Sequence, residues 1–177
     1  THGHSLGYIS AAVLCHIINR IVFPGEQKMS LKEIVLEAKN IVAEGVKNVS
    51  FSVRAGEILG IGGLVGAGRS ELVNTIFGAQ KLESGEILIK GKKVNISNPS
   101  QAIKNGIGLI PEDRKLHGLM LEKDVGFNIS ICILEKLSKY CVIDFKTEEE
   151  KQKEIVNRLR IKLPHVDVLA KTLSGGN

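Results

Sequence analysis

The stretch Gly63-Leu-Val-Gly-Ala-Gly-Arg69-Ser70 decides the fold of this chain. It follows an apolar run at residues 57–62 and leads into residues 69–77, whose apolar side chains form one helical stripe. Glycines allow several backbone N–H groups to converge on a phosphate, and the N-terminus of the following helix adds positive potential. The glycine spacing is that of a phosphate-binding loop. We therefore predict a buried strand, a phosphate-binding loop and a helix in succession.

Two side chains of this loop determine its chemistry. Ser70 offers its hydroxyl to Mg²⁺. Arg69 stands where lysine is usual; it keeps the positive charge, but its planar guanidinium cannot replace a compact ammonium between two phosphates without rearrangement. The motif therefore predicts nucleotide binding and leaves open whether the nucleotide is hydrolysed. The alternative is a purely structural glycine-rich turn that binds no ligand. The predicted nucleotide-binding residues are Gly63, Leu64, Val65, Gly66, Ala67, Gly68, Arg69, Ser70 and Glu71.

The composition is that of a folded, mildly basic protein. The 177 residues are 43% hydrophobic, enough for a sizeable core, and 24 Lys and Arg against 19 Asp and Glu give a net charge of +5. This charge suits phosphates or an anionic membrane face without identifying either. Three widely spread cysteines without a CxxC motif indicate a reduced, cytosolic setting rather than a disulfide framework. No apolar run reaches the roughly 18 residues of a membrane span.

Local patterns predict the other elements. Alternating or β-branched runs predict strands at residues 34–41, 46–53, 86–90, 93–96 and 107–110, besides the run before the loop. A turn at residues 84–85 precedes the third of these strands, and a hairpin turn at residues 91–92 follows it. Helices are expected at residues 69–77, 97–104, 124–140 and 147–159, with Gly78 ending the first.

Residues 1–28 form a separate block. Polar residues at positions 16, 19 and 20 fall on one helical face of an otherwise apolar run, which predicts a docked helix, with a membrane-surface helix as the alternative. His2 and His4 are read as incidental rather than as metal ligands, because no further ligands accompany them. We assign this block no role.

A second motif, Leu173-Ser-Gly-Gly-Asn177, lies far downstream of the loop. Together the two motifs resemble those of an ABC-type ATP-binding domain. Glu112-Asp113-Arg114-Lys115, Gly118-Leu-Met-Leu121 and Asn128-Ile-Ser130 look like the second nucleotide-binding domain of bacterial sugar importers of the ribose, galactose and xylose type. In that group the second loop typically carries arginine and the second motif typically ends in asparagine, so both oddities fit.

The resemblance implies the fold class. It is an α/β P-loop NTPase of ABC type, incomplete here, with an antiparallel β subdomain and a helical subdomain. A partial ATP-binding domain would occupy residues 29–177, with its helical subdomain at about residues 114–172.

The resemblance also implies site residues and partners. Glu112 and Asp113 take the place of the Q-loop glutamine, which senses the γ-phosphate and Mg²⁺. The signature residues that would close over ATP held by an opposite domain are Leu173, Ser174, Gly175, Gly176 and Asn177. The implied cofactors are ATP and Mg²⁺. The implied partners are another ABC ATP-binding domain fused in the parent chain, membrane permease subunits and, indirectly, a sugar-binding protein, at the cytoplasmic face of the plasma membrane.

The sequence departs from the family pattern in two ways. The helix after the signature, the strand with paired carboxylates and the switch histidine are absent from the 177 residues, so we expect a fragment that does not hydrolyse ATP alone. No adenine-stacking aromatic precedes Val46; the nearest aromatics are Phe51 and Phe23. We therefore expect the base to be held weakly or by other residues.

Three alternatives remain. The chain could be a non-catalytic remnant, a P-loop NTPase of another branch, or a nucleic-acid-associated ABC ATPase. The last is disfavoured because aromatic residues make up only 4% of the chain and no basic stripe interleaves with them. We therefore expect no nucleic-acid partner.

Overall fold

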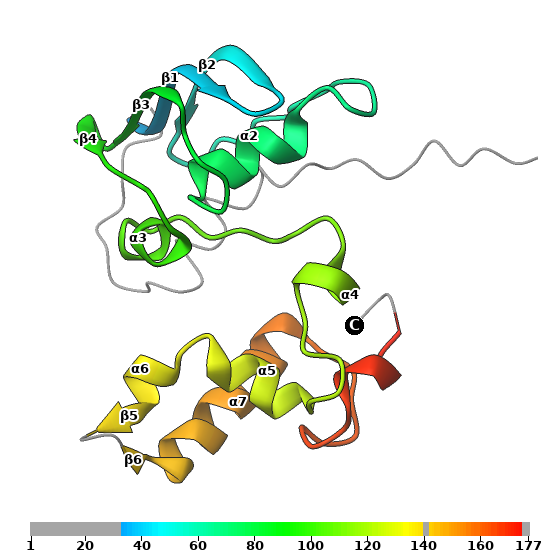
Figure 1. The fold of residues 1–177 in the computed structure, drawn as a ribbon. Helices are drawn as coiled ribbons and strands as arrows, with labels where there is room; N and C mark the ends of the chain where they lie inside the picture. Colours follow the sequence, from blue (N-terminus) through cyan, green and yellow to red (C-terminus); the bar gives the residue numbers. More distant parts are fainter. Residues whose placement is uncertain (1–32, 140–141, 175–177) are drawn as a thin grey trace, which may run out of the picture. The chain divides into compact units, whose positions relative to one another are not determined.

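The computed structural model describes residues 33–139 and 142–174, which divide between two compact units, Thr1–Glu112 and Asp113–Asn177 (Figure 1). The first unit combines a sheet with helices and the second is mainly helical, so the chain is of the mixed α/β class, as predicted. The helix predicted within residues 1–28 lies outside the described residues.

The first unit is built on an antiparallel sheet (Figure 1). Its strands, in the spatial order β2-β1-β3-β4, are β1 (Ile34–Ala43), β2 (Val46–Arg54), β3 (Ser84–Ile89) and β4 (Lys92–Val94). Alternate residues of β1 are buried, with Ile41 fully inside the core. The strands predicted at residues 34–41 and 46–53 are confirmed, as is an antiparallel β region.

A bulge at Asn40 interrupts the alternation of β1. Asn40 has a φ of 50°, and its Nδ2 donates to Asn48 Oδ1 on β2 at 2.9 Å. Across the other ladder, a Cβ on Gly85 would lie 2.6 Å from the Asn40 carbonyl oxygen, and Gly85 has a φ of +110°. Only glycine fits there. Ser84 and Gly85 are the first two residues of β3, so the turn predicted at residues 84–85 is wrong.

The β3–β4 hairpin turns through Lys90 and Gly91, with φ values of 50° and 74°. Two positive φ angles are typical of the type I′ turn, whose twist matches that of the flanking strands. The predicted hairpin is confirmed. The turn begins one residue earlier than predicted, and β4 ends at Val94 rather than at residue 96.

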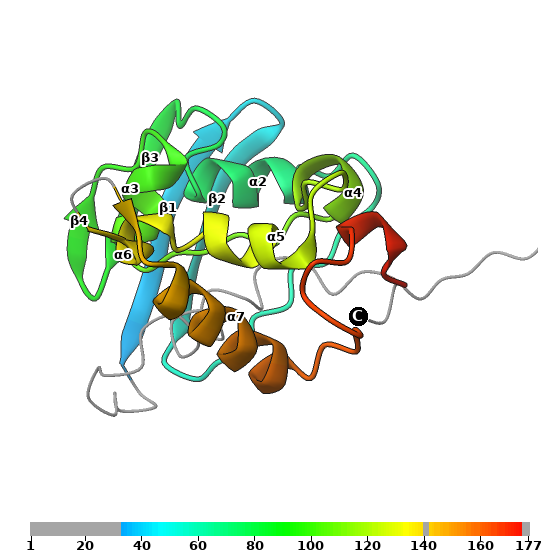
Figure 2. The same cartoon turned by 90° about the horizontal axis from the view of Figure 1, so that it is seen from below.

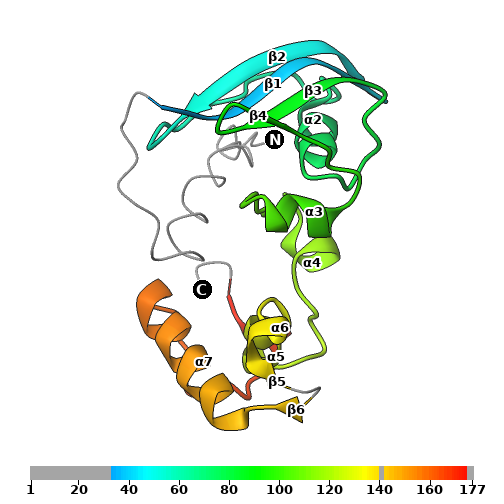
Figure 3. The same cartoon turned by 90° about the vertical axis from the view of Figure 1, so that its left-hand side faces the viewer.

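Helix α2 (Arg69–Ile76) lies against one face of the sheet (Figure 3). It buries Leu72, Thr75 and Ile76, and the Thr75 hydroxyl donates to the Glu71 carbonyl at 2.7 Å, so this buried polar group is satisfied. The helix predicted at residues 69–77 is confirmed, and Gly78, with a φ of +74°, follows its last turn as expected. Helix α3 (Pro99–Lys104) begins after the cap Asn98.

The predicted strands at residues 57–62 and 107–110 are wrong. Neither segment has regular secondary structure, and neither carries a ladder to any strand in the described part of the chain. Their apolar runs are typical of a strand buried on both faces, and such a strand needs hydrogen-bonded neighbours on each side. Without them, Ile58 is 69% exposed and Ile110 is 49% exposed.

The second unit is mainly helical. Its elements are α4 (Arg114–His117), α5 (Val125–Ile131), α6 (Leu134–Leu137), the strands β5 (Ser138–Lys139) and β6 (Val142–Ile143), α7 (Phe145–Leu159) and the 3₁₀ helix η2 (Ala170–Thr172). Helices α5 and α7 pack side by side (Figure 2).

The continuous helix predicted at residues 124–140 is wrong, although its start at the cap Asp124 is correct. The Ile133 amide bonds to the Ser130 carbonyl three residues back, which ends α5 early. After the short α6, β5 pairs with β6 and draws the chain into an extended hairpin. The later helix begins at Phe145 rather than at residue 147, because Asp144 caps it.

Candidate functional site: a glycine-rich loop before a helix

The glycine-rich loop closes on itself before α2. The Ala67 amide donates to the Leu64 carbonyl at 3.1 Å, which makes a tight turn. Gly66 and Gly68 follow with φ values of +81° and +80°, in the left-handed region that glycine adopts without strain. The sequence therefore adopts the turn that the predicted phosphate-binding loop requires.

Gly68 is the N-cap residue of α2 and gives that helix no side-chain cap. The amide groups of the first helical turn consequently have no side-chain acceptor from the cap position. Uncapped amides at a helix N-terminus present partial positive charge, which suits an anion. The loop beside them is open: Leu64 is 85% exposed and Val65 is 87% exposed.

Ser70 and Glu112 meet in space, although they are far apart in sequence. The Ser70 hydroxyl donates to Glu112 Oε2 at 3.3 Å, and both residues are exposed. Mg²⁺ prefers hard oxygen ligands, and a hydroxyl beside a carboxylate supplies two of them. The donor set thus fits the predicted Mg²⁺ at Ser70.

The stem of Arg69 packs back over the loop. A Cβ on Gly63 would lie 3.4 Å from Arg69 Cδ and 3.0 Å from Ala67 Cβ. The first and last parts of the loop are therefore in close approach, and a side chain at position 63 would have to displace its neighbours. Arg69 is half-buried by this packing.

Asp113 and Glu112 are adjacent but have different surroundings. Asp113 Oδ1 accepts hydrogen bonds from the amides of Lys115 and Leu116 and so caps α4. The amide hydrogen bonds, first that of Leu116, lower the pKa of the Asp113 carboxyl, because they stabilise its charged form. Of the two predicted Q-loop-like residues, Glu112 is therefore the one that contacts Ser70.

The described part of the second motif is Leu173 and Ser174; the predicted residues 175–177 lie outside the described residues. The chain leading to it is anchored within the second unit: the Ala170 amide donates to the Lys123 carbonyl at 2.9 Å. Lys171 Nζ forms an ion pair with Glu122 at 2.7 Å. Ser174 is exposed at the end of this anchored segment.

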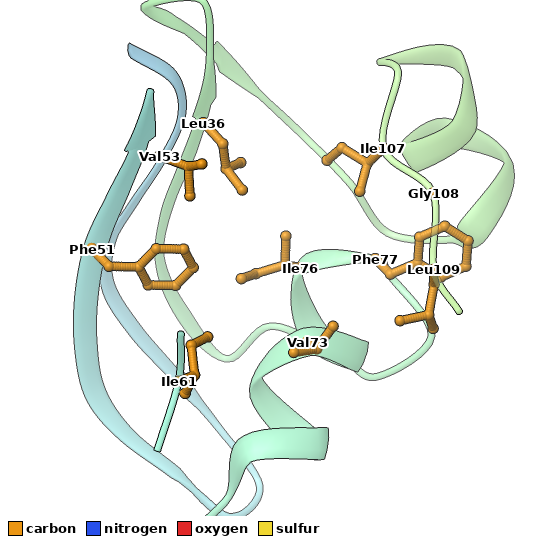
Figure 4. Close-up of a pocket in the computed structure, with 10 residues that line it drawn as sticks. All are labelled: Leu36, Phe51, Val53, Ile61, Val73, Ile76, Phe77, Ile107, Gly108 and Leu109. Atoms are coloured by element: carbon orange, nitrogen blue, oxygen red, sulfur yellow. The ribbon is translucent and has the colours of Figure 1, made fainter. Parts of the chain in front are cut away.

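An apolar pocket lies between the sheet, α2 and the segment at residues 107–109 (Figure 4). Ile61, from the run before the loop, points into it, as do the two aromatic rings Phe51 and Phe77. The aromatic nearest to Val46 that the structure describes, Phe51, therefore serves the core. Sequence reasoning did not find this pocket. Its lining residues are Leu36, Phe51, Val53, Ile61, Val73, Ile76, Phe77, Ile107, Gly108 and Leu109.

The described residues contain neither a cluster of metal-binding side chains nor a membrane-spanning helix. No group of three or more His, Cys, Asp or Glu side chains in residues 33–139 and 142–174 could hold a metal ion by itself. Within the same residues, no helix is long and apolar enough to cross a membrane.

Residues 46–177 match the family model for the ABC transporter. This match spans the loop, Glu112 and the second motif. The chain belongs to the ABC transporter family.

Curated relatives of this ABC chain are named for ribose import. The chain is 44% identical over 152 residues to the ribose import ATP-binding protein RbsA of Lactococcus lactis subsp. cremoris, covering 86% of this chain and 31% of the relative. It is 46% identical over 156 residues to RbsA of Halalkalibacterium halodurans, covering 88% of this chain and 31% of the relative. The chain thus spans about a third of the length of the curated relatives it matches.

Solved ABC structures share the fold. A nucleotide-free ATP-binding cassette from an ABC transporter is 28% identical, with a TM-score of 0.61, over 81% of this chain and 60% of that chain. A cassette in its ADP conformation is 27% identical, with a TM-score of 0.60 and the same coverage. The predicted P-loop NTPase fold of ABC type is confirmed.

Proposed function

We propose that this chain is a nucleotide-binding domain piece of an ATP-driven carbohydrate importer, which takes up a monosaccharide. The observation that carries the proposal is the loop at residues 63–70, with its turn, its left-handed glycines and the uncapped start of α2. The 44–46% identity to proteins named for ribose import supports a carbohydrate as the transported substrate. In this role the chain binds ATP through its phosphates.

Backbone and side-chain groups of the loop make different contacts with the nucleotide in this proposal. Residues 63–68 wrap the phosphates with backbone amides, while Arg69 adds a positive charge at the helix start. Mg²⁺, when bound, neutralises phosphate charge and fixes the geometry of the phosphate chain. The Ser70 hydroxyl is its proposed ligand, and Glu112 is the neighbouring Q-loop-like residue.

The second motif serves another site in this proposal. The serine and glycines at residues 173–177 close over nucleotide held by the loop of a second ABC domain, for the same electrostatic reasons as the first loop. In the parent protein, closure of the two domains rocks permease subunits, to which a sugar-binding protein delivers the substrate. Residues 114–172 form the helical subdomain that faces the permease, and the assembly lies peripherally on the cytoplasmic face of the plasma membrane.

In this proposal, nucleotide binding is assigned to this chain and ATP hydrolysis to the assembled importer. Positioning a water and holding Mg²⁺ require carboxylates beyond the described loop.

A titration of Mg-ATP into the 177-residue chain tests the proposal, with Arg69→Ala as the variant. The expected result is saturable binding that weakens on substitution, by about tenfold for loss of one charged phosphate contact. Lys104→Ala is the matched control, because it removes an exposed cation at the end of α3. Binding that is equal in Arg69→Ala and the wild type would reject the role of Arg69, and no saturable binding at all would reject the proposed function.

A further inference from the structure

Glu112 places a negative charge next to a loop built for anions. Its carboxylate lies 3.3 Å from Ser70 Oγ, and Ser70 is the second residue of α2. Amides at a helix N-terminus attract a phosphate, whereas a carboxylate at the same place repels it. The site therefore contains two opposed electrostatic features within one turn of the helix.

The repulsion acts at short range. Both side chains are exposed, so water and salt weaken it, but at about 4 Å the charges lie well inside the roughly 8 Å Debye length of physiological salt and the repulsion is not abolished. A nucleotide triphosphate seated on the first turn of α2 would bring its oxygens to the Ser70 hydroxyl, and hence to the carboxylate bonded to it. Metal-free nucleotide thus meets an unfavourable charge at the atom that the loop offers for binding.

A divalent cation reverses the sign of this contact. Carboxylate, hydroxyl and phosphate oxygens are all ligands that Mg²⁺ prefers. A divalent cation bound at this place would attract both the Glu112 carboxylate and the phosphates, and so would offset their mutual repulsion. A neutral amide in place of Glu112 would bind the ion less strongly, yet it would tolerate metal-free nucleotide.

We infer that Glu112 makes nucleotide binding at this loop conditional on a divalent cation, so that the loop accepts the metal–nucleotide complex and excludes the metal-free nucleotide. The inference rests on the proposed function, because it assumes that nucleotide phosphates bind at residues 63–70. It assigns to Glu112 a selectivity that follows from its charge rather than from its position alone.

The experiment measures the affinity of the 177-residue chain for ATP in Mg²⁺ and in EDTA. The quantity compared between variants is the affinity in Mg²⁺ divided by the affinity in EDTA. Glu112→Gln keeps the size of the side chain and removes the charge. We expect it to bind metal-free ATP more tightly and Mg-ATP less tightly than the wild type, so that the ratio falls by about tenfold. Because Glu112 is exposed, the substitution leaves the fold in place.

Two further variants separate charge from geometry. Glu112→Asp keeps the charge on a shorter stem and is expected to keep most of the metal dependence. Glu83→Gln removes an exposed carboxylate just before β3, outside residues 63–70, and is expected to match the wild type. A fall of the ratio in Glu83→Gln equal to that in Glu112→Gln would overturn the inference, since net charge alone would then explain the effect.

The remaining outcomes are also decisive. Equal affinity of the wild type for ATP in Mg²⁺ and in EDTA would overturn the inference while leaving nucleotide binding intact. An unchanged ratio in Glu112→Gln would do the same. Absence of ATP binding in every variant and both buffers would reject the proposed function, and the inference with it.

Discussion

Gly68 packs directly against the backbone of Gly45, so closely that a Cβ atom on Gly68 would overlap the Gly45 carbonyl oxygen. Gly45 lies in the two-residue turn between β1 and β2, whereas Gly68 is the N-cap of α2. The end of the loop is thus braced by the β1–β2 turn. This contact explains physically why the loop has one orientation relative to the sheet.

Gly68→Ala is therefore expected to destabilise the first unit strongly. The new methyl must displace backbone on the β1–β2 turn, and alanine at a φ of +80° adds the strain of the left-handed region. We expect a loss of about 3 kcal/mol in the free energy of unfolding. Urea unfolding followed by far-ultraviolet circular dichroism measures it, since the chain has no tryptophan.

Gly66→Ala is the matched control for Gly68→Ala. Gly66 has nearly the same φ, +81°, but no atom lies within 4 Å of its would-be Cβ. It should cost only the backbone strain, about 1 kcal/mol. Equal losses at the two positions would mean that the contact with Gly45 contributes nothing.

Much of the first unit follows from local sequence. The alternation of β1, the helical stripe of α2 and the Lys90-Gly91 turn each carry a short-range signal, and each forms near the predicted place. No short-range sequence signal predicts the bulge at Asn40, because the bulge depends on Gly85 across the ladder. Local patterns therefore find elements better than they find the irregularities that join them.

The errors come from elements whose partners are distant. The run at residues 57–62 has the composition of a buried strand, but composition cannot supply the neighbouring strands that such a structure needs. The break after Ile131 depends on β5 and β6, which have two residues each and no pattern of their own. The contact of Ser70 with Glu112 joins residues 42 apart in sequence, and no local pattern predicts it.

Ser70→Ala should lower the affinity for Mg-ATP and leave that for metal-free ATP nearly unchanged. The variant loses the hydroxyl proposed to ligate Mg²⁺ but keeps the backbone amide that faces phosphate. We expect a loss of about tenfold in Mg²⁺, measured by ATP titration. Ser70→Thr restores a hydroxyl and should bind like the wild type; a loss in Ser70→Thr as large as in Ser70→Ala would argue against coordination.

The start of α7 should be sensitive to acid. Asp144 accepts hydrogen bonds from the Thr147 amide and hydroxyl and from the Lys146 amide, and these bonds lower the pKa of its carboxyl, with the Thr147 amide the largest cause. A lowered pKa in the folded state stabilises the fold above the unfolded value of about 3.9, and this stabilisation is lost as the pH falls through the folded value.

Asp144→Asn therefore should lower the urea midpoint relative to wild type at pH 7, and the difference should shrink below about pH 3.9. Asparagine also caps helices, so the variant tests the charge rather than the cap. Thr147→Val removes the 2.8 Å hydroxyl bond to Asp144 and keeps the amide bond. It should lower the pKa of Asp144 less than the wild type does, so that stability is lost over a narrower pH interval. A wild-type advantage over Asp144→Asn that persists undiminished at pH 2 would contradict the assignment.

Gly126 and Gln152 should be energetically coupled at the contact of α5 with α7. A Cβ on Gly126 would lie 3.0 Å from Gln152 Nε2, the atom that donates to the buried Ser130 hydroxyl at 2.8 Å. Gly126→Ala alone therefore displaces the Gln152 side-chain amide. It should lower the free energy of unfolding by about 1 kcal/mol, because the hydrogen bond to Ser130 is weakened. In a Gln152→Ala background the space is free, and the same substitution should become neutral or stabilise by up to about 1 kcal/mol through helix propensity. A double-mutant cycle in urea measures the coupling, and an equal cost of Gly126→Ala in both backgrounds would show that Gln152 is not the group it meets.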